Sequence, residues 1–267
     1  MIRAALRMEI ARIRSLTLWT AVVAAAYTSI VAGFYPTFRD NQKQIDQYME
    51  LFPKDLLKVF GMSGSLADPG NFFNSYIGGM LWPIVGAMVA IALATRPVAA
   101  DLERGFLELP LATRLSRIRY LGVAIAGQFG ALVVVSAAMI AGMLVVGRAL
   151  DAPFDVGRFS LAGVHAVAFG CAIAGPVTLL AVVTLDRGRA TGISVGLILA
   201  MYLLDAASKV WTDLEGVASF SLFSHFQTLE LIDDGVLPTA DFVLLVAVAV
   251  VGWGLALLAF RRRDLAA

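Results

Sequence analysis

Long apolar runs separated by charged segments set the pattern of this 267-residue chain. A helix that crosses a lipid bilayer needs about 20 mostly apolar residues. Six runs come near that length, and we predict that each forms a membrane-spanning helix. Their approximate bounds are 16–35, 76–95, 120–147, 160–185, 191–204 and 242–260. The fifth is the shortest, because its apolar character fades from Asp205 onward.

The composition agrees with this pattern. Apolar and aromatic residues make up 59% of the chain, charged residues only 15%, and the mean hydropathy is +0.81. A soluble globular domain is about 45–50% apolar and about 25% charged. The surplus indicates that many apolar side chains face lipid. We therefore predict an all-α integral membrane protein, with one transmembrane domain over residues 1–267 embedded in the lipid bilayer.

The Lys and Arg residues between the runs predict the orientation, because cytosolic loops of membrane proteins carry an excess of basic residues. With the N-terminus in the cytosol, 14 of the 21 basic residues fall on the cytosolic side and 7 on the outer side. The acidic residues divide the other way, 6 against 14. We predict six spans with both termini in the cytosol.

The segment before the first span has its own pattern. Apolar residues recur there at helical spacing: Ile2, Leu6, Ile10 and Ile13. Basic residues lie between them: Arg3, Arg7 and Arg14. This pattern is typical of a basic amphipathic helix that lies in the inner membrane interface and continues into the first span. The alternative is an ordinary positive flank of that span.

The two long outer connections predict short helices. Between Gln42 and Phe60 apolar residues recur near helical spacing, and Pro53 can open a second helix. We expect two short amphipathic helices on the outer face of the bundle, followed by a turn over residues 61–74. Residues 205–241 are too apolar for a disordered linker, so we expect short interfacial or re-entrant helices there.

The sequence lacks the residue patterns of several chemical functions. No G-x-x-x-x-G-K-[ST] segment is present, so the chain does not hold a nucleotide through that loop. His225 is expected to be a solvated loop histidine, although a metal site with Glu230 or Asp233 is conceivable. The lone Cys171 lies in an apolar run and is expected to be buried and inert. The basic segments follow from the topology and do not call for nucleic acid.

The predicted span centres contain no Asp, Glu, Lys or Arg, although Gln128 and His165 lie within spans. Ionisable residues in a membrane usually mark ion pathways, so their absence argues against an ion-coupled carrier. Asp205 closes the fifth span and can pair with Lys209 four residues on. Small residues four apart allow close helix packing. These pairs are Ala126 and Gly130, Ala138 and Gly142, and Gly192 and Gly196.

The segment between the second and third spans, residues 96–119, is the most densely charged connection. It carries five arginines and three acidic residues. It resembles the ABC-2 type permeases, the membrane subunits of ABC exporters, which have an acidic pair and R-G-T-L-E-L-L-L-A-T-P-V-S-R at this place. The matching residues are Glu103, Arg104, Gly105, Leu107, Glu108, Leu109, Leu111, Ala112, Thr113, Ser116 and Arg117. The departures are Phe106 for Thr, Pro110 for Leu and Arg114 for Pro.

The resemblance implies that this segment forms a coupling helix that docks on a separate ATP-binding subunit. The residues implied in that contact are Glu103, Arg104, Gly105, Phe106, Leu107, Glu108, Leu111, Arg114 and Arg117. Secondary cytosolic contacts are expected from Arg3, Arg7, Asp186, Arg187 and Arg189. Because proline disrupts a helix interior, Pro110 predicts a broken or displaced coupling element. A solvated loop that only follows the charge rule is the alternative.

The resemblance also implies the partners. Two ATPase subunits would bind ATP and Mg, and a second copy of this chain or a sister permease would complete the membrane part. No cofactor, metal or enzymatic activity is expected on this chain, and the expected location is the cell membrane of a prokaryote. The alternatives are a membrane scaffold or assembly protein without a transport cycle, and an ion-coupled carrier.

Overall fold

A computed structural model describes residues 2–62, 64–79, 81–97 and 116–262. Helices make up 83% of the described residues, which contain no strand. Six helical segments in this part are long and apolar enough to cross a membrane, which confirms the predicted all-α, multi-pass architecture. The long helices are α1 (Ile2–Asp40), α5 (Leu81–Ala94), α8 (Arg117–Ala149), α9 (Val156–Thr184), α10 (Arg187–Ser208) and α13 (Thr239–Arg262).

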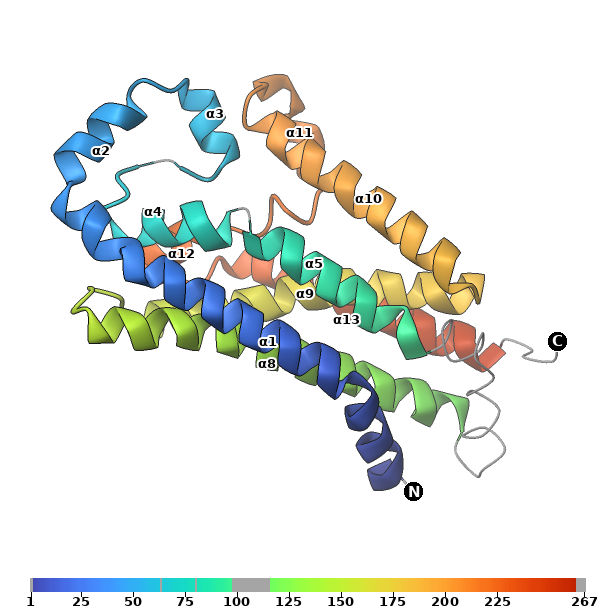
Figure 1. Ribbon diagram of the computed structural model, residues 1–267. Coiled ribbons are helices and arrows are strands. Elements are labelled where there is room, and N and C mark those ends of the chain that lie inside the picture. The colour runs from blue at the N-terminus through green and yellow to red at the C-terminus, as the bar shows by residue number, and fades with distance from the viewer. Residues whose placement is uncertain (1, 63, 80, 98–115, 263–267) are drawn as a thin grey trace.

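The bundle has two ends of different character (Figure 1). At one, here called the terminal end, α1 begins, α13 ends and α9 passes into α10. The other, here called the loop end, carries the short helices α2 (Gln42–Met49), α3 (Lys54–Val59), α4 (Pro69–Phe73) and α12 (Leu229–Asp234). It also carries the π-helix η1 (Asn74–Gly78), the 3₁₀-helix η3 (Thr212–Leu214) and α11 (Glu215–Ala218).

The fifth and second spans show how the helix bounds differ from the predicted spans. The fifth span was expected over residues 191–204, but α10 begins at Arg187 and continues through Asp205 to Ser208. At its end, Asp205 and Lys209 form the expected pair, with Oδ2 and Nζ 2.9 Å apart. The second span was expected from Tyr76, but helical structure begins at Pro69 and passes through η1 before α5.

Side chains at the first turns explain where several helices begin. Asp155 accepts a hydrogen bond from the backbone N–H of Arg158 at the start of α9, at 2.8 Å. Asp68 does the same for Asn71 at the start of α4, at 3.0 Å. Both satisfy a backbone donor that has no partner inside the helix. These caps fix the positions of the loop-end connections.

Helix α9 lies at the centre of the bundle and packs against α5, α8, α10 and α13. Its closest neighbour is α13. A Cβ atom added to Gly175 of α9 would lie only 2.6 Å from the carbonyl oxygen of Ala249 of α13. Gly252 meets Gly175 and Pro176 in the same way. Small residues let two helix backbones approach closely in a membrane. These glycines therefore allow the backbones of α9 and α13 to pack in direct contact.

Helix α1 packs along α8. The hydroxyl of Thr28 donates to the carbonyl of Met139 at 2.8 Å, and that of Ser29 donates to the carbonyl of Gly142 at 3.2 Å. A Cβ at Gly142 would lie 2.4 Å from the carbonyl oxygen of Ala25. Of the glycines in the predicted small-residue pairs, Gly142 therefore packs as expected. The glycines Gly130, Gly192 and Gly196 face open space.

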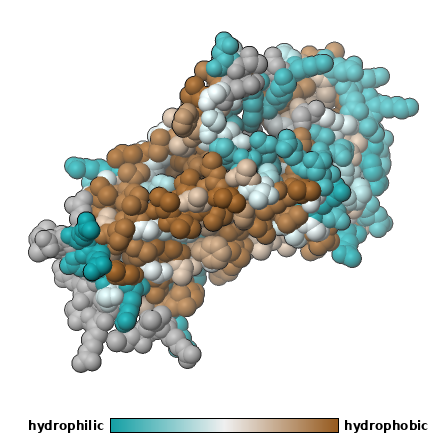
Figure 2. Space-filling model, turned by 180° about the vertical axis from the view of Figure 1, so that it is seen from behind, coloured by the Kyte–Doolittle hydropathy of each residue, from teal (hydrophilic) through white to brown (hydrophobic). Residues whose placement is uncertain are grey.

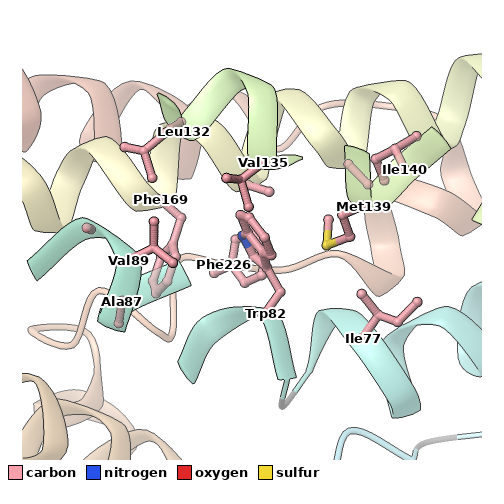
Figure 3. Close-up of a cluster of buried hydrophobic side chains, with 14 of the residues drawn as sticks. Ile77, Trp82, Ala87, Val89, Leu132, Val135, Met139, Ile140, Phe169 and Phe226 are labelled. Atoms are coloured by element: carbon pink, nitrogen blue, oxygen red, sulfur yellow. The ribbon is translucent and has the colours of Figure 1, made fainter. Parts of the chain in front are cut away.

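The main core lies between α5, α8 and α9 (Figure 3). Trp82 from α5, Val135 from α8 and Phe169 from α9 point toward one another there, with Phe226 from the loop before α12. All four side chains are buried. Phe226 therefore anchors the 205–241 connection in the bundle. Its short helices agree with the expectation for that connection.

An apolar belt covers the long helices between two more polar ends (Figure 2). Large exposed apolar side chains occur on α1, α10 and α13, such as Trp19, Leu199 and Val250. The short helices α2 and α3 also form where predicted. Their apolar residues Tyr48 of α2 and Leu56 of α3, however, are exposed and do not pack on the bundle as expected.

Candidate functional site at the terminal end

Most of the predicted coupling residues lie outside the described part of the chain. These are Glu103, Arg104, Gly105, Phe106, Leu107, Glu108, Leu111 and Arg114, as well as Pro110. Their docking role stays a prediction. Arg117 is described and forms the first residue of α8. What the structure does define is how the two ends of this segment are held.

Both ends of the 98–115 segment are fixed at the terminal end of the bundle. The Tyr120 hydroxyl, on the first turn of α8, donates a hydrogen bond to the carbonyl of Pro97 at 2.6 Å. Ser116 caps α8 by accepting from the N–H of Arg119 at 3.4 Å. Pro97, three residues after the end of α5, and Tyr120, in the first turn of α8, are thus joined directly.

A small apolar cluster underlies this junction and joins four helices. It consists of Ala5, Tyr120, Leu121, Val182, Ala256 and Phe260. Phe260 is fully buried, and its ring lies 6.4 Å from that of Tyr120. The cluster brings the start of α1, the start of α8, the end of α9 and the end of α13 together. The predicted contacts Arg7, Arg117 and Asp186 therefore emerge at one end of the molecule.

The predicted inner loop at Asp186 is shorter than expected. Arg187 and Arg189 belong to the first turn of α10, and only Leu185 and Asp186 connect it to α9. Leu185 ends α9 in the left-handed region, with φ of 53°. Asp186 caps α10 through the N–H of Arg189 at 2.8 Å, and its other oxygen lies 3.3 Å from Nε of Arg189. Asp186 and Arg189 are therefore already paired with each other.

The N-terminal part of α1 contains a buried acid that sequence reasoning missed. Glu9 is 7% exposed and lies on the same stripe as Ala5 and Ile13, which are also buried. A Cβ at Gly127 of α8 would lie 3.0 Å from Cγ of Glu9. The spacing of Ala5, Glu9 and Ile13 is the signal that could have found it. The expected apolar positions Leu6 and Ile10 are exposed, and so is Arg7, while Arg3 lies in the first turn.

A second polar centre lies at the loop end, where the prediction for His225 was wrong. Its side chain is 16% exposed, with Nδ1 2.7 Å from Oδ1 of Asp241 and Nε2 2.9 Å from the carbonyl oxygen of Ser219. Each ring nitrogen of His225 is therefore in hydrogen-bond contact with an oxygen atom. His165, fully buried, contacts the carbonyl oxygen of His225 through Nε2 at 3.1 Å. No group of three or more potential metal ligands occurs within the described ranges.

Gln128 connects three spanning helices in the middle of the bundle. Its Oε1 accepts from the Thr178 hydroxyl of α9 at 3.2 Å and from Nε1 of Trp253 of α13 at 3.1 Å. Gln128 is 2% exposed. The sequence indicated a polar residue in the third span, but not its two partners. This contact is structural and offers no titratable group for ion coupling.

Comparison with known proteins finds no matching family model and no matching curated protein. The resemblance of residues 101–117 to the ABC-2 type permeases therefore stays a prediction. The structural observation that bears on this prediction is the geometry of the terminal end.

Proposed function

We propose that the chain is the permease subunit of an ATP-driven ABC transporter that works as an exporter. The 98–115 segment would receive the movement of a separate ATPase subunit. The Pro97–Tyr120 hydrogen bond carries this proposal, because it joins the chain just after α5 to the first turn of α8, on either side of the segment. The motif-like residues from Glu103 to Arg117 supply the charges and apolar side chains for such a contact.

The proposed movement passes from the segment into α5 and α8. Two ATPase subunits hold ATP and Mg, and they close on each other when both sites are filled. The segments docked on them then shift, and α5 and α8 tilt as a pair. Because α9 packs on both helices, the tilt would spread through the centre of the bundle.

A second permease, identical or sister, completes the proposed complex. Support comes from α10, where only Ala190, Ser194 and Asp205 are buried. A Cβ at Gly192 or Gly196 would meet no atom within 4 Å, so this face can accept a close helix from another chain. In this arrangement α10 would pack between the two copies.

The proposed orientation places the terminal end in the cytosol of a prokaryotic cell. Arg7, Arg117, Arg119 and Arg189 lie at this end, as the positive-inside rule requires of a cytosolic face. The loop end, with most of the acidic residues, then faces outward. The N-terminal turns of α1, with Leu6 and Ile10 exposed, would rest in the inner interface.

The test is co-purification with an ATPase encoded beside this chain. Charge reversals at Arg104 and Glu108 should weaken that complex, since losing a central interface contact costs about 2 kcal/mol, or roughly thirtyfold in affinity. Hydrolysis stimulated by the permease should fall with it. The matched control is Lys54→Glu on α3, a charge reversal at the loop end.

The outcome separates the proposal from a scaffold role. If both reversals leave ATPase binding and stimulated hydrolysis at the level of Lys54→Glu, the segment does not couple the two subunits. An intact complex that moves no substrate in proteoliposomes with ATP would leave a scaffold or assembly protein as the better description.

A further inference from the structure

A long apolar groove runs between α8 and α13, with α9 as its floor. Its volume is about 680 Å³. Small residues such as Ala137, Gly163 and Ala168 line it, and larger ones would fill it. The groove exists because α13 packs closely along α9 but contacts α8 much less. It lies on the side of the bundle, within the span of the long helices.

The groove is closed toward the terminal end and continues toward the loop end. At its closed end, the hydrogen bond from Trp253 to Gln128 ties α13 to α8, and Trp253 and Phe129 line the wall. Toward the loop end the lining reaches Leu144 on α8 and Phe242 on α13. The groove is therefore a slot that stops near the middle of α9 and α13.

The length of the slot is closer to one leaflet of a bilayer than to the full hydrocarbon core. At a rise of 1.5 Å per residue, its lining is about 17 Å long on α13, from Phe242 to Trp253, and on α9, from Ser160 to Cys171. On α8, from Phe129 to Leu144, it is about 22 Å long. Half of a typical hydrocarbon core of about 30 Å is about 15 Å. A spanning helix from another protein would continue across both leaflets, whereas this slot ends halfway. An acyl chain that enters from the loop-end leaflet has the required length and chemistry.

A charged residue continues the lining where the acyl chain would emerge. Ala137, Ala141 and Leu144 line the groove on one stripe of α8, and Arg148 follows one turn after Leu144 on that stripe. Arg148 is exposed and has no ion-pair partner within the described part of the chain. An arginine presents several donors that suit a phosphate group. Arg148 is thus placed at the depth of the lipid headgroups.

We propose that this groove binds one glycerophospholipid of the loop-end leaflet. One acyl chain fills the slot down to the Gln128–Trp253 contact, and the phosphate pairs with Arg148. The site is independent of the proposed transport function, since it uses neither the coupling segment nor α10. A bound lipid here would complete the packing between α8 and α13.

The test uses a phosphatidylcholine with a photoactivatable diazirine near the end of one acyl chain. The full chain is reconstituted in vesicles that contain this lipid, irradiated, and mapped by mass spectrometry. The expected result is concentrated labelling of α9 and α13 near Cys171 and Trp253, above that of the exposed face of α1 at Val22 and Ile30. Ala137→Phe should fill the slot and reduce that labelling several-fold.

Matched variants keep the result interpretable. Ala126→Phe places the same ring on an exposed position of the same helix outside the groove, and should leave the labelling unchanged. Arg148→Glu should reduce it, whereas Arg39→Glu at the loop end of α1 should not. Equal labelling of the groove and of the exposed face of α1 would overturn the site. Groove labelling that is unchanged in Arg148→Glu would overturn the headgroup contact but not the acyl-chain site.

Discussion

Helices α9 and α10 are neighbours in the chain and both are apolar enough to span a membrane, yet they pack in opposite ways. In the most apolar window of each, 72% of the residues are buried in α9 and 17% in α10. The difference lies in the glycines. Gly163, Gly170 and Gly175 of α9 each meet a neighbouring helix, whereas Gly192 and Gly196 of α10 face open space. An apolar run thus indicates a span, but the contacts of its small residues decide whether it is a core helix.

The largest expected effect comes from the α9–α13 contact. Gly252→Leu would add a side chain at a position where a Cβ atom alone would lie 2.5 Å from the backbone of Gly175. Overpacking of this kind costs about 1–3 kcal/mol, and backbone atoms cannot move aside as side chains do. The free energy of unfolding in detergent, measured by thermal or SDS titration, should fall by about 1–3 kcal/mol or more.

Two glycine controls make this comparison sharp. Gly254→Leu lies two residues away on α13 and meets no atom within 4 Å, so it should leave stability nearly unchanged. Gly196→Leu on α10 should also spare the single chain, but it should weaken the association of two permeases if α10 forms that contact. Equal destabilisation by all three would contradict the packing explanation, because leucine favours a helix more than glycine does and Gly196 and Gly254 have open space around them.

The next effect concerns how α10 is fastened to the bundle. Ser221 donates to the carbonyl of Met201 on α10 at 2.9 Å, and four residues later His225 pairs with Asp241 on α13. Asp241→Asn removes the charge that the His225 ring faces. Because hydrogen bonds to charged groups contribute about 1.5–3 kcal/mol and this pair is partly exposed, the expected loss is about 1 kcal/mol.

The measurement is hydrogen exchange, which reports local opening as well as global stability. Amides at the loop end of α10 and in residues 219–228 should exchange faster in Asp241→Asn, while those of α9 should not. Asp213→Asn, an exposed acid in η3, is the control. Faster exchange throughout the bundle would show instead that the His225 contact supports the whole core.

A smaller effect is expected from Gln128→Leu, which removes the acceptor shared by α9 and α13. Hydrogen bonds between membrane helices contribute about 0.6 kcal/mol on average, and two are lost here. Thr178 keeps its 2.7 Å bond to the carbonyl of Ala174, so its hydroxyl is not left without a partner. A fall of about 1 kcal/mol in the free energy of unfolding is expected. Trp253 fluorescence should also shift, since its N–H loses its acceptor.

The comparison also explains what could be read from the sequence. The apolar runs predicted all six candidate spans, because a run of about twenty apolar residues has the length that a spanning helix needs. The Asp205–Lys209 pair followed from its spacing alone. His225 was misjudged because its partner Asp241 lies 16 residues away, and only the fold brings the two together. The roles of Gly175 and Gly252 were equally hidden, since a glycine that packs and one that faces lipid look the same in sequence.

The candidate site was less predictable than the fold. The motif from Glu103 to Arg117 could be found by resemblance, but its contacts with a partner are not encoded in any local pattern. The Pro97–Tyr120 bond joins residues 23 positions apart and has no sequence signature. Glu9 was overlooked because the apolar repeat drew attention to Leu6 and Ile10. The helix turns its stripe of Ala5, Glu9 and Ile13 toward α8 instead.

The smallest expected effect is a pH-dependent one at Asp233, where α12 meets α4 and α9. Burial, and then the nearby charges of Asp68 and Asp234, raise the pKa of the Asp233 carboxyl, while Arg158 opposes them. Because the folded protein holds this proton more tightly than the unfolded chain, stability falls as pH rises through the interval between the two pKa values. Asp233→Asn removes the charge and should be more stable than the parent above that interval.

The difference between Asp233→Asn and the parent should shrink as the pH falls and vanish below about 3.9, the ordinary pKa of an aspartate. It should stay small throughout, because the Asp233 side chain is largely exposed. Melting temperatures of both proteins across this pH range provide the measurement. A gap that persists in acid would mean that the amide group introduced by Asp233→Asn acts through its hydrogen bonds, and not through the lost charge, because asparagine and aspartate have nearly the same shape.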